Sequence, residues 1–171
     1  VDSALRSFTS RNFKVVGESG HVYGYGKSVW AMIDLDTRHP ADILAVRGGL
    51  ITEYIETEYP CPIEKSSRVK LSVGATPIRS IDTYYNDVDI NGHINSVKYI
   101  EHVLDLWDVA WYKQHRIKRF EIAYVAESHQ GDRLHFYREG RYSDTDFNVR
   151  ITKSNRDSEE VEVCRCRVQF V

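Results

Sequence analysis

The segment Asp89-Ile90-Asn91-Gly92-His93-Ile94-Asn95-Ser96-Val97-Lys98-Tyr99-Ile100 joins a polar stretch directly to a helical pattern. From here onward the apolar residues recur at the spacing that places side chains on one face of a helix, namely Val97, Ile100, Val103, Leu104 and Trp107. Asn95 or Ser96 suits the N-cap. Polar groups just before a helix lie beside unpaired N–H groups and the positive end of the dipole, where an oxyanion or a polarised carbonyl is stabilised. The segment is therefore a candidate site.

Strand patterns flank this helix. Partial alternation through Leu71, Val73, Ile78 and Ile81 predicts a strand that leads into the motif. After the helix we expect four strands, at about residues 120–127, 134–142, 147–153 and 160–171, separated by polar turns. The simplest arrangement is an antiparallel meander with one long helix across the concave face of the curled sheet.

The first part of the chain has strands but no long amphipathic helix. Residues 7–16 and 22–35 predict a β-hairpin, and Gly24 and Gly26 indicate either a bulge in its second strand or the close approach of another surface. A short helix is expected within residues 41–50, ended by Gly48-Gly49. Residues 56–70 are rich in charges and contain two prolines, a composition suited to a connector.

Composition excludes several classes of function. The chain is 42% hydrophobic, enough to build a core, and its net charge of -2 gives no electrostatic case for nucleic acid or a membrane as partner. No apolar run approaches the roughly 20 residues that span a bilayer. No import or secretion pattern is present, so the expected location is cytoplasmic. The three cysteines do not suggest a disulfide framework, and we predict that Cys164 and Cys166 are buried free thiols.

Calcium binding is one interpretation of the motif. Asp87, Asp89, Asn91 and Gly92 match the opening positions of an EF-hand loop. The twelfth position of such a loop needs a bidentate glutamate, and this chain has Lys98 there, which would place a cation where the metal needs oxygens. We therefore predict no metal site.

Two interpretations stay open on the residues alone. The motif is either a polar turn followed by a capped helix, or a hydrolytic site. Asp89, Asn91 and His93 alternate, so in an extended conformation they would project to one side near the helix start. Such a set is what carboxyl-ester or thioester chemistry requires.

A resemblance favours the second interpretation. Residues 89–100 resemble the D-x-N-x-H-x-N-N-x-K-Y-I signature of acyl-acyl carrier protein thioesterases, which are built from two hotdog domains. Tyr124-Val125-Ala126-Glu127 with Gly131-Asp132 resembles the family's strand that carries an acidic residue. Further similarity to the later half of the family's first domain lies at Arg11-Asn12-Phe13, Gly20, Ser28-Val29-Trp30, Ile33-Asp34 and Thr37-Arg38-His39-Pro40.

The resemblance implies an α+β double hotdog fold. Residues 1–55 would be the C-terminal part of a first hotdog domain that is incomplete in this chain. Residues 56–72 would be a linker, and residues 73–171 would form a second hotdog domain that carries the catalytic motif.

The resemblance also implies an activity: hydrolysis of fatty acyl-acyl carrier protein to free fatty acid, which ends chain elongation, without metal or cofactor. The implied catalytic residues are Asp89, Asn91, His93 and Glu127. We expect Glu127 to be the base and Asp89 to support the network, while the helix start near Ser96 polarises the thioester carbonyl.

Ser128 stands where many plant members of the family carry a cysteine. It has no evident base beside it in the sequence, so we expect water to be the nucleophile. Among the other histidines, His102, His115, His129 and His135 are expected to be solvated, as is His21.

Two other functions remain as alternatives, an acyl-coenzyme A thioesterase and a non-catalytic module that binds an acyl ligand. For the carrier protein, Arg116, Lys118 and Arg119 are candidate contacts, because an acidic partner would meet a basic patch. A homodimer is possible.

Overall fold

The computed structural model describes residues 1–72, 74–154 and 160–171, so the predicted strand residue Val73 and most of the last predicted turn lie outside the described residues. The chain divides into two compact units, Val1–Lys65 and Ser66–Val171. Within the described ranges, no helix combines the length and hydropathy needed to cross a membrane.

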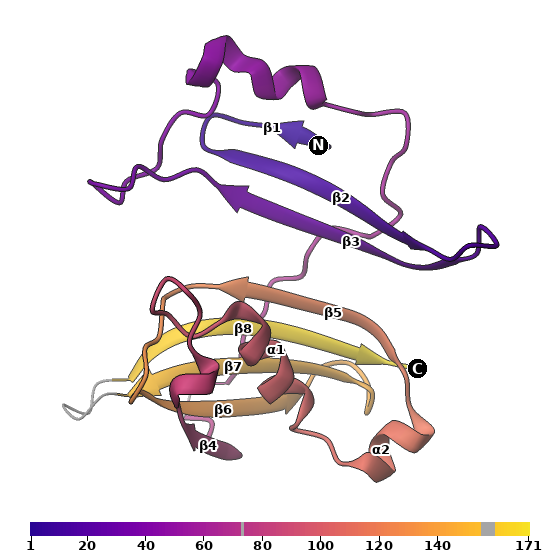
Figure 1. Ribbon diagram of the computed structural model, residues 1–171. Helices are drawn as coiled ribbons and strands as arrows, with labels where there is room; N and C mark the ends of the chain where they lie inside the picture. The colour runs from indigo at the N-terminus through magenta and orange to yellow at the C-terminus, as the bar shows by residue number, and fades with distance from the viewer. Residues whose placement is uncertain (73, 155–159) are drawn as a thin grey trace. The chain divides into compact units, whose positions relative to one another are not determined.

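The first unit contains a three-stranded antiparallel sheet in the order β1-β2-β3 (Figure 1). Its strands are β1 (Ser3–Ala4), β2 (Phe8–Val16) and β3 (Val22–Ala31). The predicted hairpin is confirmed, although β3 ends before residue 35. The pairing shifts by one residue between Val15 and Val16, opposite Gly24, which confirms the bulge.

The expected short helix is displaced. A 3₁₀ helix, η1 (Val46–Tyr54), begins within the predicted range 41–50 and ends four residues after it. Arg47, Gly48 and Gly49 have positive φ angles of 48°, 65° and 82° inside it, so the glycines kink the segment and the helical turns continue beyond them.

The second unit is a five-stranded antiparallel sheet in the order β4-β6-β7-β8-β5 (Figure 1). Its strands are β4 (Arg79–Asp82), β5 (Ile117–Tyr124), β6 (Arg133–Gly140), β7 (Asp146–Ser154) and β8 (Glu160–Phe170). The predicted four-stranded meander is wrong, because β5 pairs with β8 and β6 pairs with β4. Only β6, β7 and β8 follow one another in sequence and in space.

Two short helices replace the single long helix that we predicted. A 3₁₀ turn, η2 (Tyr85–Asp87), precedes α1 (Ser96–Leu104), and α2 (Val109–Gln114) follows. Asn95 is the N-cap of α1, and its side chain accepts the Val97 N–H at 3.0 Å. The long helix is broken because Asp105 closes α1 and the Asp108 carboxylate caps α2, accepting the Trp111 N–H at 2.8 Å.

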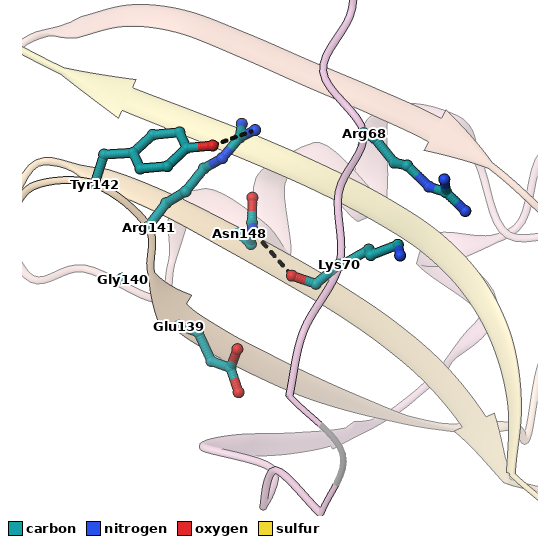
Figure 2. A pocket seen from close by; sticks show the side chains of 7 residues that line it. All are labelled: Arg68, Lys70, Glu139, Gly140, Arg141, Tyr142 and Asn148. Atoms are coloured by element: carbon teal, nitrogen blue, oxygen red, sulfur yellow. Dashed lines mark hydrogen bonds between the residues drawn. The ribbon is translucent and has the colours of Figure 1, made fainter.

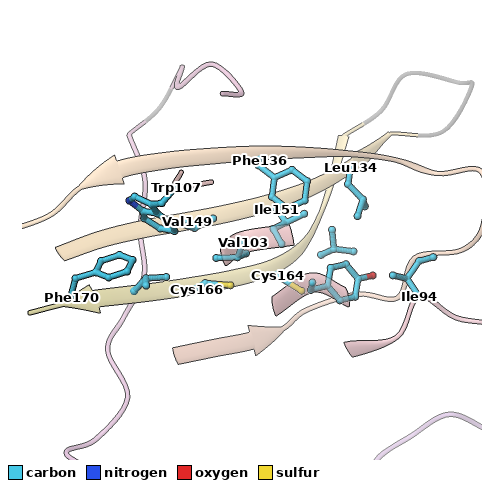
Figure 3. Close-up of a cluster of buried hydrophobic side chains, with 13 residues drawn as sticks. Ile94, Val103, Trp107, Leu134, Phe136, Val149, Ile151, Cys164, Cys166 and Phe170 are labelled. Atoms are coloured by element: carbon cyan, nitrogen blue, oxygen red, sulfur yellow. The ribbon is translucent and has the colours of Figure 1, made fainter. Parts of the chain in front are cut away.

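The core of the second unit lies between α1 and one face of the sheet (Figure 3). Val103 of α1 is fully buried against residues of β6, β7 and β8. The fully buried residues of these strands include Leu134, Phe136, Val149, Ile151, Cys164, Cys166 and Val168. The prediction of buried free thiols is therefore confirmed at both strand cysteines. This packing fixes α1, and with it the motif at its N-terminus, on the sheet.

The other face of this sheet carries a charged network. Arg167 donates to both carboxylate oxygens of buried Asp146 at 2.9 and 2.8 Å, and these bonds lower the pKa of that carboxyl. Arg167 also reaches Glu121, which accepts from Arg119 at 2.8 Å and from Ser67. Arg119 is thus held in an internal ion pair, which contradicts its prediction as a carrier-protein contact.

Candidate active site

The motif before α1 is a closed turn. The Asp89 N–H donates to the His93 carbonyl at 2.8 Å, and the Gly92 N–H donates to the Asp89 carbonyl at 3.1 Å. Gly92 has a φ angle of +81°, a conformation that suits glycine. Residues 89–93 are therefore not extended, the conformation in which Asp89, Asn91 and His93 would project to one side; they form the polar turn of the first interpretation, and the turn itself brings these side chains together.

Asp89 organises this turn through its carboxylate. One oxygen accepts the Asn91 N–H at 2.8 Å and the His93 N–H at 3.3 Å, and the other lies 3.4 Å from the Asn91 amide nitrogen. Desolvation raises the pKa of Asp89, but the two backbone N–H donors outweigh it and leave the pKa below the ordinary value of 3.8. Asp89 is therefore a stable anion that shapes the turn and is a weak proton acceptor.

Glu127 contacts this turn through His93. It lies three residues beyond the end of β5, and its carboxylate is 3.4 Å from His93 Nε2. The side chains of His93 and Glu127 are 31% and 50% exposed, so water reaches both. Of the four predicted site residues, Asn91 and His93 are joined through Asp89, and His93 contacts Glu127 directly.

Backbone hydrogen bonds hold the two segments together. The Ile94 N–H donates to the Ser128 carbonyl at 2.8 Å, and the Asn95 N–H donates to the Asp87 carbonyl at 2.7 Å. Thr83, which follows β4, donates its hydroxyl to the carbonyls of His129 and Asp132, each at 2.8 Å. The loop after β5 is thus attached both to the motif and to the strand that leads into it.

Two histidines that we expected to be solvated lie at or near the site. The His129 ring lies edge-on to the His93 ring, with centroids 5.1 Å apart. His102 Nε2 is 3.7 Å from Asp87, and neither His102 ring nitrogen is exposed. The sequence did offer a signal for His129, which is only two residues beyond Glu127. The sequence offered no signal for His102, because it lies off the apolar face of α1, where surface residues also lie.

His135 and His115 also depart from that expectation. His135 lies between the hydroxyls of Ser80 and Ser154, each 2.8 Å away, and His115 stacks on Trp111. Both therefore have structural contacts away from the motif.

The start of α1 has one N–H group open to a ligand. Asn95 accepts the Val97 N–H through its side chain and the Lys98 N–H through its carbonyl, the latter at 2.9 Å. Within the described residues the Ser96 N–H has no acceptor. A thioester carbonyl at this point would meet that N–H group and the positive end of the helix dipole.

Ser128 does not offer a nucleophile in this structure. Ser128 follows Glu127 in the chain and is fully buried, so its hydroxyl cannot contact a substrate. Across the described part of the chain, no three His, Cys, Asp or Glu side chains converge as metal ligands would.

A polar groove of about 450 Å³ lies elsewhere in the second unit (Figure 2). Its lining residues are Arg68, Lys70, Glu139, Gly140, Arg141, Tyr142 and Asn148. The groove is at the end of β6, whereas the motif is attached near Arg133, where β6 begins. Seven residue steps separate Arg133 from Gly140, or roughly 23 Å along a strand, so we do not assign the groove to the candidate site.

Comparison with known sequence families gives two matches. Residues 72–170 match the acyl-ACP thioesterase C-terminal domain, and residues 1–46 match the acyl-ACP thioesterase N-terminal domain. A curated palmitoyl-acyl carrier protein thioesterase of the chloroplast from Gossypium hirsutum is 27% identical over 113 residues, which are 64% of this chain and 27% of that protein.

Solved structures also resemble this chain. An acyl-ACP thioesterase from Bacteroides thetaiotaomicron is 46% identical, with a TM-score of 0.87 over 99% of this chain and 65% of the other. The 12:0-ACP thioesterase from Umbellularia californica is 20% identical, with a TM-score of 0.80 over 99% of this chain and 64% of the other, and shows the shared fold. The predicted α+β hotdog fold is thereby confirmed. The chain spans about a quarter of the curated relative and about two thirds of each of these solved chains.

Proposed function

Because the chain belongs to the acyl-ACP thioesterase family, we propose that the protein hydrolyses the thioester between a fatty acyl chain and acyl carrier protein. Hydrolysis would release the free fatty acid and end chain elongation. The observation that carries this proposal is the contact of His93 with Glu127 at 3.4 Å, beside the turn that Asp89 organises and at the start of α1.

The chemistry assigns each residue a role. Glu127 accepts a proton from the water whose oxygen attacks the thioester carbonyl carbon. The carbonyl oxygen takes up negative charge and is stabilised by the Ser96 N–H and the dipole of α1. When the carbon–sulfur bond breaks, His93 supplies the proton that the leaving thiolate needs, and the proton that Glu127 took from the water replaces it on His93. Asn91 orients the water or the carbonyl, and Asp89 holds the turn.

Three further assignments belong to this proposal. Residues 1–55 are part of one hotdog domain, residues 56–72 are a linker, and residues 73–171 form the domain that carries the site. The location is cytoplasmic, which fractionation of the source cells would test. The protein is a possible homodimer, which light scattering would test.

Arg116 and Lys118 are exposed and remain candidate contacts for the acidic carrier protein. Reversing both charges would raise KM for the acyl-carrier substrate and leave KM for an acyl-coenzyme A unchanged. An equal KM for the carrier substrate in the variant and the wild type would remove these two residues from the docking surface.

The test of the activity is release of free thiol from palmitoyl- and decanoyl-carrier protein, compared with the same acyl groups on coenzyme A. We expect faster release from the carrier protein, and loss of release in His93→Ala but not in His21→Ala, an exposed histidine of the first unit. Faster release from coenzyme A would indicate an acyl-coenzyme A thioesterase. Tight acyl binding without release from either substrate would indicate a binding module.

A further inference from the structure

A histidine of α1 has buried ring nitrogens without a hydrogen-bond partner. His102 lies six residue steps, or roughly 9 Å, into the helix from Ser96. Neither of its ring nitrogens reaches solvent, and within the described residues neither makes a hydrogen bond. The ring lies edge-on to the buried ring of Phe136, with centroids 6.2 Å apart. A buried polar group without a partner is destabilising, so an imidazole at this place requires an explanation.

The His102 ring faces the carboxylate of Asp87. His102 Nε2 lies 3.7 Å from one carboxylate oxygen, which is too long for a hydrogen bond and within the range of an ion pair. The side chains of His102 and Asp87 are only 20% and 14% exposed, so water and salt screen this contact little. Lys98, one turn earlier on the same side of α1, is already paired with Glu101 at 2.9 Å. His102 is therefore the buried group of α1 that meets Asp87.

Asp87 is also bonded to the start of α1. Its second carboxylate oxygen accepts the Tyr84 N–H at 2.8 Å and closes the turn η2. Its carbonyl accepts the Asn95 N–H at 2.7 Å. Asn95 is the N-cap of α1 and directly precedes Ser96, whose N–H is the proposed donor to the thioester carbonyl. The backbone of Asp87 thus holds the first residues of the helix, while its side chain meets His102 in the middle of the helix.

We propose that His102 is a positioning residue, whose contact with Asp87 holds η2 against α1 and keeps the Ser96 N–H directed at the thioester carbonyl. This inference rests on the proposed thioesterase function and adds a residue to it. His102 does not contact substrate, since its ring nitrogens are buried, and it acts through Asp87. A donor to the developing oxyanion is effective only when it is held in place beforehand, so displacing it lowers kcat and leaves binding of the acyl chain unchanged.

The kinetic test uses variants of both partners with palmitoyl-carrier protein as substrate. His102→Phe keeps an aromatic ring against Phe136 and removes the ring nitrogens, and it should lower kcat about 10-fold with KM unchanged. Asp87→Asn keeps an acceptor for the Tyr84 N–H and removes the charge, and should have a similar effect. The double variant should be no worse than the poorer single variant, because both act through one contact. His102→Gln restores an N–H donor to this side chain and should recover kcat to within about threefold of wild type.

His135→Phe is the matched control. His135 is also partly buried, and its ring nitrogens lie 2.8 Å from the hydroxyls of Ser80 and Ser154, away from the motif. This variant should lose stability but keep kcat within about twofold of wild type. A wild-type kcat in both His102→Phe and Asp87→Asn, no recovery in His102→Gln, or losses that multiply in the double variant would overturn the inference.

Amide hydrogen exchange provides a readout that is independent of activity. Exchange at the Asn95 N–H, which donates to the Asp87 carbonyl, should rise about 10-fold in His102→Phe and Asp87→Asn, with no change in His135→Phe. Unchanged exchange at Asn95 in the first two variants would contradict the positioning role. If the wild-type protein releases no thiol, the proposed function fails, while the exchange measurement still decides whether His102 and Asp87 hold the start of α1.

Discussion

Replacing Glu127 with glutamine separates catalysis from stability. Two unit charges 3.4 Å apart attract by about 1 kcal/mol in water, and a pair as exposed as His93 and Glu127 contributes only about 0.2–1 kcal/mol to stability even with His93 protonated. A chain of this size changes its Tm by about 2–4 °C for each kcal/mol, so Glu127→Gln should lower Tm by less than about 4 °C.

The loss of activity should be much larger. A positioned general base accelerates its reaction about 10²- to 10⁴-fold, which corresponds to about 3–5 kcal/mol of barrier. The free energy lost in the transition state therefore exceeds the loss of stability several-fold. We expect kcat/KM for palmitoyl-carrier protein to fall at least 100-fold, measured by thiol release in the intact protein, with Tm followed by circular dichroism.

Glu101→Gln is a closely matched control for this measurement. Glu101 pairs with Lys98 at 2.9 Å, and the two side chains are 53% and 31% exposed, close to the values for Glu127 and His93. The control removes the same charge from a similar ion pair one helical turn away from the site, and should leave kcat/KM within about threefold of wild type. Turnover by Glu127→Gln at the wild-type rate, or an equal loss in Glu101→Gln, would refute Glu127 as the base.

Three further predictions follow from the pKa shifts. Folding lowers the pKa of Asp89, so the stabilising effect of its carboxylate is present above pH 3.8 and is lost as the pH falls below that value. In thermal scans below pH 3.8, the Tm difference between wild type and Asp89→Asn should therefore shrink. Burial raises the pKa of Tyr99 from 10 to about 12, so its contribution is complete below pH 10 and lost between pH 10 and 12. Wild type should lose about 2–3 kcal/mol more than Tyr99→Phe in denaturant titrations across that range, and equal losses would refute the shift. Burial raises the pKa of Cys164 and of Cys166, the latter to about 12, whereas Cys61 is partly exposed. Mass spectrometry should therefore find one N-ethylmaleimide adduct on the folded protein, and rapid addition of a second adduct would contradict the burial of Cys164 and Cys166.

Local features of the chain were predictable because they depend on neighbours in sequence. The apolar spacing after Val97 identified the face of α1 that packs on the sheet, and of the two predicted N-cap residues, Asn95 and Ser96, the structure selects Asn95. The hairpin of β2 and β3 and the bulge beside Gly24 followed from alternation and from glycine. The end of the helix was missed, because the Asp108 carboxylate takes the Trp111 N–H and starts a new helix, while the apolar pattern continues past it.

The candidate site was predictable in its residues and not in its geometry. Asp89, Asn91 and His93 were selected by type and spacing. The turn that joins them depends on the positive φ angle of Gly92 and on the hydrogen bonds of the Asp89 carboxylate, and neither would be present in an extended segment. Glu127 was placed with them by resemblance alone. Periodicity says nothing about which loop lies against which; in the structure the Ile94–Ser128 backbone hydrogen bond joins the two segments next to the 3.4 Å contact of Glu127 with His93.

By itself the sequence predicted most of the strands, the capped start of α1, the residues of the motif and the family to which the chain belongs. Only the tertiary structure decided that β5 pairs with β8, that Arg119 is held by Glu121 and that Ser128 is fully buried. The physical reason is that alternation and capping are encoded within a few residues, whereas strand order and burial depend on contacts between segments that are distant in sequence.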